Sequence, residues 1–189
     1  QVSTTLYNAV LRAELNVTER SPHSMTVHYV DLSEDAAIAG TYKDFKFVNS
    51  TEYPIYIEGY TTSDKKITFN IYGKETRDKN RTISFESQMV SETPATTILQ
   101  EDAGQGIGYK AVSSKGSSGY VAELYKIVKV NGVETDRIKV NKSTYKGTNR
   151  VVTYGTAGDP TLSENLRAAI AAQDEALADA NIAAAVPAQ

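Results

Sequence analysis

The chain has 189 residues, no cysteine and a formal net charge of −3 at pH 7. The lack of cysteine excludes disulfides, thiolate zinc sites and a cysteine nucleophile within these residues. The weakly acidic balance argues against a nucleic-acid-binding protein, because such proteins need a basic surface to neutralise phosphates. No stretch approaches the roughly 20 apolar residues of a transmembrane helix, so we expect no membrane span in this chain.

The first region is expected to open with a helix. Leu6, Val10 and Ala13 recur at spacings of four and three, which places them on one face of a helix. Ser3 or Thr4 is the expected N-cap, since a hydroxyl at a helix start accepts a bond from an otherwise unpaired N–H. This first region spans residues 1–79, and strands are expected to follow the helix.

The strands of the first region follow from β-prone runs. Residues 53–60 and 66–72 are two such runs separated by a short polar segment, which is the pattern of a hairpin. The next region, residues 80–156, is β-prone almost throughout. Its clearest signal is Asn131-Gly132, which lies between the β-prone residues 120–130 and 133–140 and predicts a tight hairpin turn.

Glycines cluster between residues 104 and 119, and they favour turns or a close approach of backbones. We therefore expect residues 80–156 to form an elongated, Gly-rich, all-β module. Together with the helix and strands of residues 1–79, this predicts an α+β fold that is mostly β. The remaining residues, 157–189, form an Ala-rich tail whose composition and pattern differ from those of the two regions before it.

The tail is acidic and has a helical pattern. It carries a net charge of −4, so the residues before it carry +1 together. Thr161 and Glu164 fit a capping box, and the helix is expected to run to about Ala185. Its apolar stripe is thin and has Gln173 in the middle, which is typical of a marginal helix or a linker. A helix that docks on a neighbouring subunit is the alternative.

The N-terminal residues carry short motifs in a fixed order. These are QVSTTLYNAV at 1–10, ERSPHS at 19–24, Val27, Tyr29 and Val30, Asp35-Ala36, and DFKF at 44–47 with Asn49. Over roughly residues 1–75 this pattern resembles VanW-like proteins, except that Ser33-Glu34 stands where the family usually has a glycine. In that family a Gly-rich stretch ending in Cys directly precedes the residue that matches Gln1. The resemblance therefore implies the C-terminal part of a VanW-like domain.

Residues of about 82–155 resemble a G-five domain, a small extracellular β module named for its glycines. The matching features are Thr93-Pro94, the glycine cluster, Tyr125 before Asn131-Gly132, and the closing residues 144–155. The two resemblances support each other, because VanW-like domains are often followed by this module. They imply a bacterial protein of the cell surface or cell wall. A G-five domain further implies binding to amino sugars or cell-wall polymers, or a spacer role, whereas VanW-like domains imply no established activity.

The resemblance also implies a conditional catalytic site. A Cys directly before Gln1 would lie at the start of the first helix, where the helix dipole lowers the pKa of a thiol. His23 is then a candidate base and Asp35 a candidate group to orient it, giving a Cys/His/Asp arrangement. Within this chain no catalytic residue is expected, because the nucleophile is absent. His23 and His28 are five residues apart and do not form a metal pair, so we expect no metal and no cofactor.

Three tyrosines of the β module are candidate ligand-binding residues. Tyr109, Tyr120 and Tyr125 offer aromatic faces on which sugar rings stack. The alternative is that they fill a half-buried face of a sheet, where tyrosine is common. Sequence alone leaves both open.

Two functions follow from these patterns. The first is a non-enzymatic extracellular protein of the cell wall, including a subunit of a surface assembly, whose β module contacts glycan or acts as a spacer. Its expected partners are a cell-wall glycan or peptidoglycan, and another protein chain that completes residues 1–75. The alternative is a fragment of a cell-wall-modifying enzyme whose Cys lies upstream of Gln1.

Overall fold

The computed structural model describes residues 1–185. Within them the chain is an α+β protein that is mostly β, which confirms the predicted fold class. Contacts divide the chain into two compact units. Unit 1 comprises residues 1–92 and 120–146, and unit 2 comprises residues 93–119 together with the chain from residue 147 onward. Residues 186–189 of the expected tail lie outside the described residues.

Unit 1 opens with helix α1, Val2–Arg12. Of the three residues that the sequence spacing placed on one face, Val10 is buried, whereas Leu6 and Ala13 are partly buried against the same core. Val10 has no exposed surface. The expectation that Ser3 or Thr4 caps the helix is wrong, because both lie inside it. Their hydroxyls donate to the carbonyl oxygen of Ala36 instead, at 2.7 and 3.0 Å, so these side chains fix α1 to a distant loop.

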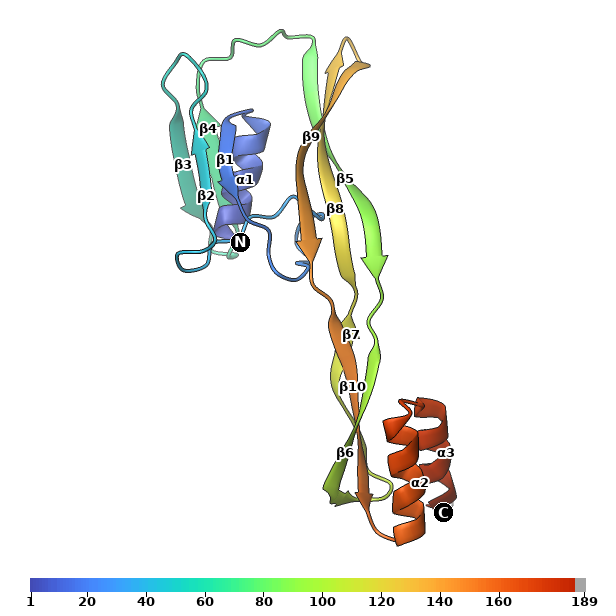
Figure 1. The fold of residues 1–189 in the computed structure, drawn as a ribbon. Coiled ribbons are helices and arrows are strands. Elements are labelled where there is room, and N and C mark those ends of the chain that lie inside the picture. Colours follow the sequence, from blue (N-terminus) through green and yellow to red (C-terminus); the bar gives the residue numbers. More distant parts are fainter. Residues whose placement is uncertain (186–189) are drawn as a thin grey trace. The chain divides into compact units, whose positions relative to one another are not determined.

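The strands of unit 1 are β1 (Asn16–Arg20), β2 (Phe45–Val48), β3 (Tyr56–Thr61), β4 (Ile67–Tyr72), β5 (Arg81–Thr93), β8 (Gly119–Val130) and β9 (Val133–Tyr145). They form three small sheets. Strands β1 and β2 are antiparallel, β3 and β4 form a separate antiparallel hairpin, and the third sheet has the order β5–β8–β9. Figure 1 shows these strands with α1 in the N-terminal unit.

The hairpin of β8 and β9 turns at Asn131-Gly132, as the sequence predicted. Both turn residues have positive φ, 51° and 81°, which is the conformation of a type I′ turn. Asparagine and glycine tolerate this left-handed region better than other residues. The strand assigned to residues 120–130 is likewise confirmed.

The core of unit 1 joins the N-terminal region to the β module. It consists of Tyr7, Val10, Leu11, Leu15, Ala36, Phe45 and Leu124, with Phe85 and Val140 packed against it. Leu124, on β8, is completely buried in the same cluster as α1. The first region and the sheet β5–β8–β9 therefore exclude water together and form one folded unit.

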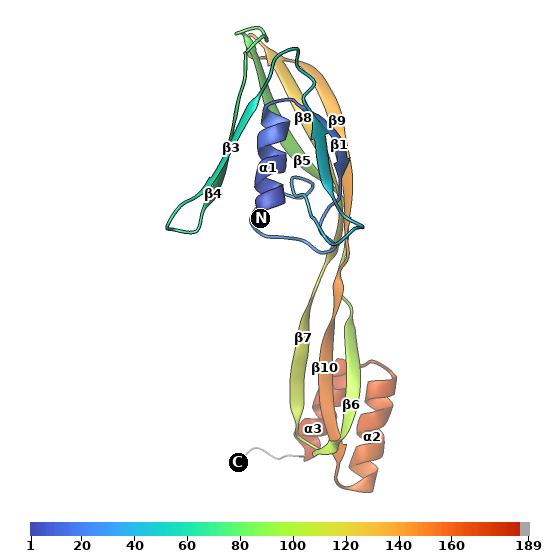
Figure 2. The same cartoon turned by 90° about the vertical axis from the view of Figure 1, so that its left-hand side faces the viewer.

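Unit 2 contains the strands β6 (Thr97–Gly106), β7 (Lys110–Ser117) and β10 (Thr148–Ala157) and the helices α2 (Pro160–Ala171) and α3 (Glu175–Ala185). Figure 2 shows β10 in the middle of the sheet, between β6 and β7. β10 runs parallel to β6 and antiparallel to β7. Leu99, Val152 and Tyr154 from the sheet pack with Leu166, Ala169, Ile170 and Ala178 from the helices. The Ala-rich tail thus covers a sheet of its own chain.

The tail departs from the sequence expectation in two ways. Asp159, not Thr161, caps α2, because its carboxylate accepts the backbone N–H groups of Thr161 and Leu162 at 2.9 and 3.1 Å. The predicted single helix is also broken. Gln173 has a φ of 56°, and its amide group bonds both the N–H and the carbonyl of Leu99, at 2.8 and 3.0 Å.

Among residues 1–185, none of the helices has the length and apolar character needed to cross a membrane.

Candidate functional sites

Asp35 is the centre of a buried polar cluster in unit 1. Its side chain is 1% exposed and accepts bonds from the Arg20 guanidinium at 2.8 Å, from the His23 backbone N–H at 2.6 Å, and from the Tyr145 hydroxyl. The ring Nδ1 of His23 lies 2.7 Å from Asp35 Oδ2. Burial by itself would raise the pKa of Asp35, but these donors outweigh it, so the pKa lies below its usual value.

Two elements far apart in sequence hold this cluster. Arg20 ends β1 and also donates to the Asp35 carbonyl at 2.6 Å and to the Ser143 hydroxyl at 2.7 Å. Tyr145 ends β9 and accepts the Ser33 N–H at 2.7 Å. Burial and the neighbouring Asp35 carboxylate raise the pKa of Tyr145, which keeps its hydroxyl protonated as a donor. A buried carboxylate needs such partners, because leaving it without them is costly.

His23 contacts Asp35, the second residue that the sequence hypothesis named. Its side chain is 30% exposed, and the contact to Asp35 occupies Nδ1, which leaves Nε2 as the second ring nitrogen. Ala36, the residue after Asp35, binds the hydroxyls in the first turn of α1. Tyr29 lies edge-on to His23 with ring centroids 6.4 Å apart, and its hydroxyl is 3.4 Å from Thr4 Oγ1. The start of α1 is therefore close to the His23–Asp35 pair.

His28 is exposed and is not paired with His23. Within residues 1–185 there is no group of three or more His, Asp or Glu side chains suited to hold a metal ion.

A second carboxylate cluster is centred on Glu14, directly after α1. Its φ is 57°, and the bonds from Glu14 N–H to Leu11 and from Leu15 N–H to Val10 close the helix in a Schellman motif. Glycine usually takes this position, because a side chain is strained there. Glu14 uses the position to place its carboxylate among cations from three other segments.

The partners of Glu14 are Arg81 on β5, Lys126 on β8 and Arg77 in the segment before β5, the last two at 3.0 and 2.9 Å. Arg81 binds both carboxylate oxygens. Its hydrogen bond is the main reason why the pKa of Glu14 lies far below the usual range, although burial opposes this shift. The cluster connects α1 to the sheet of the β module.

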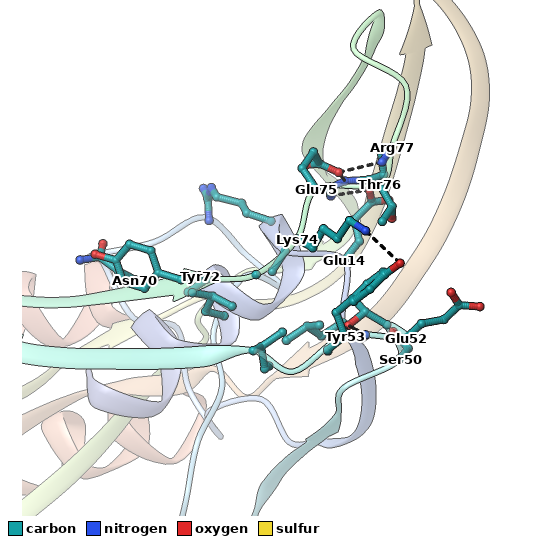
Figure 3. A pocket seen from close by; sticks show the side chains of 18 of the residues that line it. Glu14, Ser50, Glu52, Tyr53, Asn70, Tyr72, Lys74, Glu75, Thr76 and Arg77 are labelled. Carbon is teal, nitrogen blue, oxygen red and sulfur yellow. Dashed lines mark hydrogen bonds and ion pairs between the residues drawn. The ribbon is translucent and has the colours of Figure 1, made fainter.

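An open pocket of about 830 Å³ lies beside the Glu14 cluster, between the end of α1, the residues before β3, and β4 (Figure 3). The residues that line it include the aliphatic Ile55 and the aromatic Tyr53, Phe69 and Tyr72. Lys74 Nζ lies 4.1 Å from the centroid of the Tyr53 ring and donates to its hydroxyl at 3.0 Å. Figure 3 shows this contact as a dashed line among the residues that line the pocket.

The charged groups of this pocket are only partly neutralised by one another. Arg77 is paired with Glu75 and Glu14. In the described part of the chain, Arg12 and Lys74 make no ion pair with a carboxylate, and Glu52 makes none with a cation. The pocket therefore combines aromatic surface with charges that are free to meet a ligand.

The three tyrosines singled out from the sequence are not grouped in one unit. Tyr109 belongs to unit 2 and is 41% exposed. Tyr120 and Tyr125 belong to unit 1, are half-buried on β8, and donate to Glu92 at 3.3 Å and Glu123 at 2.7 Å.

Sequence reasoning found His23 and Asp35 but missed their other partners, Arg20, Ser143 and Tyr145. It also missed the Glu14 cluster. Lys126 was a signal of the Glu14 cluster, because a lysine within a β-prone, mostly apolar run needs a partner of opposite charge. The absence of a glycine after the first helix was a second signal. A residue other than glycine is strained in the left-handed position at a helix end, so a contact of its side chain has to compensate for that strain.

Comparisons with known proteins match both parts of the chain. Residues 1–72 match the family described as VanW like protein, and residues 85–157 match the G5 domain. A stretch of 57 residues is 44% identical to a protein of Bacillus subtilis (strain 168) named "Uncharacterized protein YoaR". That match covers 30% of this chain and 19% of the relative, so the chain spans about a fifth of the relative's length.

Two solved structures are similar to part of the chain. The first, "IgA1 Protease G5 domain structure", is 24% identical with a TM-score of 0.32, and the match covers 44% of this chain and all of that one. The second, "Crystal structure of HP0197-G5", is 20% identical with a TM-score of 0.25, and covers 40% of this chain and 97% of that one. The domain assignment rests on the two family matches and not on these structures.

Proposed function

We propose that this chain is an extracellular protein that binds a cell-wall glycan. Residues 1–72 belong to the VanW-like family and residues 85–157 form a G5 domain. These two families point to a cell-wall-associated protein. The proposed location is the cell surface or the cell wall. The observation that carries the proposal is the pocket beside α1.

The pocket has the size and the chemistry of a saccharide site. Its volume of about 830 Å³ falls within the range of small-ligand pockets, roughly 300–1,000 Å³. Tyr72, which is 53% exposed, and the ring face of Tyr53 that Lys74 does not cover supply apolar surface for the C–H groups of a sugar ring. The cations of Arg12 and Lys74 add hydrogen-bond donors for hydroxyl, carboxylate or phosphate oxygens.

The tyrosines of the G5 domain remain a second proposed contact. Tyr109 is the most exposed of them, while Tyr120 and Tyr125 are tied to carboxylates. Their hydroxyl–carboxylate pairs resemble the polar groups that orient a sugar beside an aromatic ring. A G5 domain without such contacts would serve as a spacer.

Titration of the chain with soluble peptidoglycan fragments, followed by backbone chemical shifts, tests the proposal and separates the two sites. We expect shifts at Tyr53 and Tyr72. Tyr72→Ala should weaken binding about tenfold, the size of a contact worth ~1.4 kcal/mol. Tyr42→Ala is the matched control, because Tyr42 is 77% exposed and does not line the pocket.

Other outcomes decide between the alternatives. Shifts confined to Tyr109, Tyr120 and Tyr125 would move the site to the G5 domain. No shift in either group at millimolar ligand would reject glycan binding and leave the spacer role.

A second candidate function is nucleophilic catalysis in a longer chain with a Cys directly before Gln1. The observation that favours it is the 2.7 Å contact between His23 Nδ1 and Asp35 Oδ2, close to the start of α1. A carboxylate that orients a histidine leaves the other ring nitrogen to accept a proton from a thiol.

The test is the thiol pKa in a chain that carries this added Cys, measured from the rate of alkylation against pH. We expect a pKa well below the ordinary value of about 8.5, and an increase towards that value in His23→Ala. An ordinary thiol pKa that does not respond to His23→Ala would reject the candidate. His28→Ala is the control, because His28 is exposed and not paired with His23.

A further inference from the structure

The outer edge of β3 is open. Strand β3 belongs to a two-stranded sheet, and within residues 1–185 it pairs only with β4. The register between the two strands is regular over all six residue pairs, from Tyr56–Tyr72 to Thr61–Ile67. An edge of this kind presents unpaired N–H and C=O groups to another strand.

The hairpin fixes which residues present these groups. Thr62, directly after β3, donates its N–H to the carbonyl of Lys66 at 3.0 Å. In an antiparallel pair the bonded residues alternate, so Tyr56, Glu58 and Tyr60 bond towards β4. The N–H and C=O groups of Ile57, Gly59 and Thr61 therefore point away from β4, along the open edge.

This edge lacks most of the usual protections against pairing, and its one charged residue is Glu58. It contains no lysine, no proline and no bulge, and five of its six residues are exposed. Tyr56 is 65% and Tyr60 46% exposed. The glycine in its middle is supported, because the Phe69 ring lies where a side chain at Gly59 would be, 2.6 Å from the position of a Cβ. The strand is thus regular in its pairing and accessible.

We propose that β3 pairs with β3 of a second copy of this chain, forming a continuous antiparallel sheet of four strands. This inference does not rest on glycan binding. A two-fold axis normal to the sheet keeps each face on the same side, so even-numbered residues oppose even-numbered ones. Three registers then bring the outward-pointing groups together, centred on Glu58, on Gly59 or on Tyr60.

Charge selects among these registers. Centring on Glu58 places two carboxylates opposite each other, which destabilises a strand pair. Centring on Gly59 uses all the outward groups and opposes Glu58 with Tyr60 of the second copy, an acceptor with a donor. It also opposes Ile57 with Thr61, a pair of β-branched side chains that suits a sheet. Centring on Tyr60 leaves Ile57 beyond the paired segment. The geometry therefore favours the register centred on Gly59.

Disulfide trapping tests both the pairing and the register, because the chain has no cysteine of its own. In the new pairing Glu58 and Tyr60 occupy non-hydrogen-bonded positions, where opposed Cα atoms are about 4.5 Å apart, close enough for a disulfide. We expect a mixture of Glu58→Cys and Tyr60→Cys chains to oxidise to mixed dimers. Dimers formed by Glu58→Cys alone would support a different register, and so would dimers formed by Tyr60→Cys alone.

A matched pair of variants separates the edge from the fold. Thr61→Pro removes an outward N–H without removing a bond to β4, and Thr61→Val keeps the N–H. In light scattering we expect wild type and Thr61→Val to dimerise and Thr61→Pro to be monomeric, with unchanged circular dichroism in all three. The proposal is overturned if wild type stays monomeric at submillimolar concentration without mixed disulfides. It is also overturned if a monomeric wild type pairs only with added strands of other sequence.

Discussion

A buried carboxylate of unit 1, Asp35, and the acids of α3 in unit 2 are stabilised in opposite ways. In unit 1 the Asp35 side chain is 1% exposed and is surrounded by donors from β1, β9 and the intervening loop. In unit 2 the acids of α3 stay near the surface. There Asp179 and Glu175 pair with Lys110 and Arg150, and Asp179 is 48% exposed. Burial determines how much such pairs contribute, because solvent screens exposed ions and leaves buried ones dependent on their partners.

The two units also share one way of ending a helix. Helices α1 and α2 both end in a Schellman motif with a long polar residue, Glu14 or Gln173, at the left-handed position. In each unit that side chain reaches across to a strand. The difference is again charge, since Glu14 meets three cations whereas Gln173 meets the neutral backbone of Leu99.

The largest expected effect is that of Asp35→Asn. It leaves the buried Arg20 without its carboxylate, and breaking a buried pair of this kind costs about 3–5 kcal/mol. Asp31→Asn is the control, because it removes the same charge at an exposed position and should change stability by less than about 0.5 kcal/mol. Amide hydrogen exchange should locate the loss in unit 1. Equal effects of the two substitutions would contradict the buried role of Asp35.

The same carboxylate predicts the direction of the pH dependence. The folded pKa of Asp35 is lowered, so its contribution is fully present above the unfolded value of about 3.9. It is lost as the pH falls through the lower folded pKa. Urea unfolding between neutral and strongly acid pH should therefore show a steep acid loss in wild type that is much weaker in Asp35→Asn.

A smaller effect is expected from glycine at the two helix ends. Glycine relieves a left-handed strain of roughly 1 kcal/mol at either position. Glu14→Gly also leaves three cations without their shared carboxylate, for a net loss of about 1–3 kcal/mol. Gln173→Gly loses three neutral bonds, two to Leu99 and one to the Ile170 carbonyl, and should cost less than Glu14→Gly, about 1 kcal/mol after the relief of strain. Chemical unfolding measures both, and a larger loss for Gln173→Gly would reverse the comparison.

Next in size is the cap of α2. Asp159→Ala should destabilise unit 2 by about 1 kcal/mol, because the carboxylate satisfies two otherwise unpaired N–H groups. Thr161→Ala, at the cap that the sequence motif predicted, should cost less than about 0.5 kcal/mol. Thermal unfolding of the two variants decides which residue is the cap. A loss confined to Thr161→Ala would be incompatible with the structure.

The smallest effect is expected at the exposed acids. Asp179→Asn should cost about 0–1 kcal/mol at low salt, and the difference from wild type should shrink as salt is added. The effect of Asp35→Asn should persist at high salt, since its partners are buried. Unfolding in low and high sodium chloride makes this comparison, and an Asp179→Asn effect that ignores salt would argue against screening as its cause.

Much of the local structure was predictable from the sequence. The period of Leu6 and Val10 indicated α1, and Asn131-Gly132 indicated the β8–β9 turn, because both signals act within a few residues. The pairing of His23 with Asp35 was anticipated only as a hypothesis about residue types. Their distance depends on Arg20 and Tyr145, and the latter is 110 residues from Asp35.

The errors have a common physical origin. Ser3, Thr4 and Thr161 carry good capping side chains, but tertiary contacts took the hydroxyls of Ser3 and Thr4, and Asp159 supplied a stronger acceptor for α2. No glycine in the sequence indicated the helix break at Gln173. Its left-handed backbone is stable because the side chain bonds to Leu99 in the neighbouring sheet.

The sequence by itself determined the two family domains, the predominance of strands, the first helix and the tight hairpin turn. These depend on motifs, periodicity and the backbone preferences of single residues. Only the tertiary structure decided that the N-terminal region shares a core with β8, that Asp35 and Glu14 collect partners from distant strands, and that β3 leaves an edge open. Such features depend on which side chains lose contact with water together, and no local window of sequence contains that information.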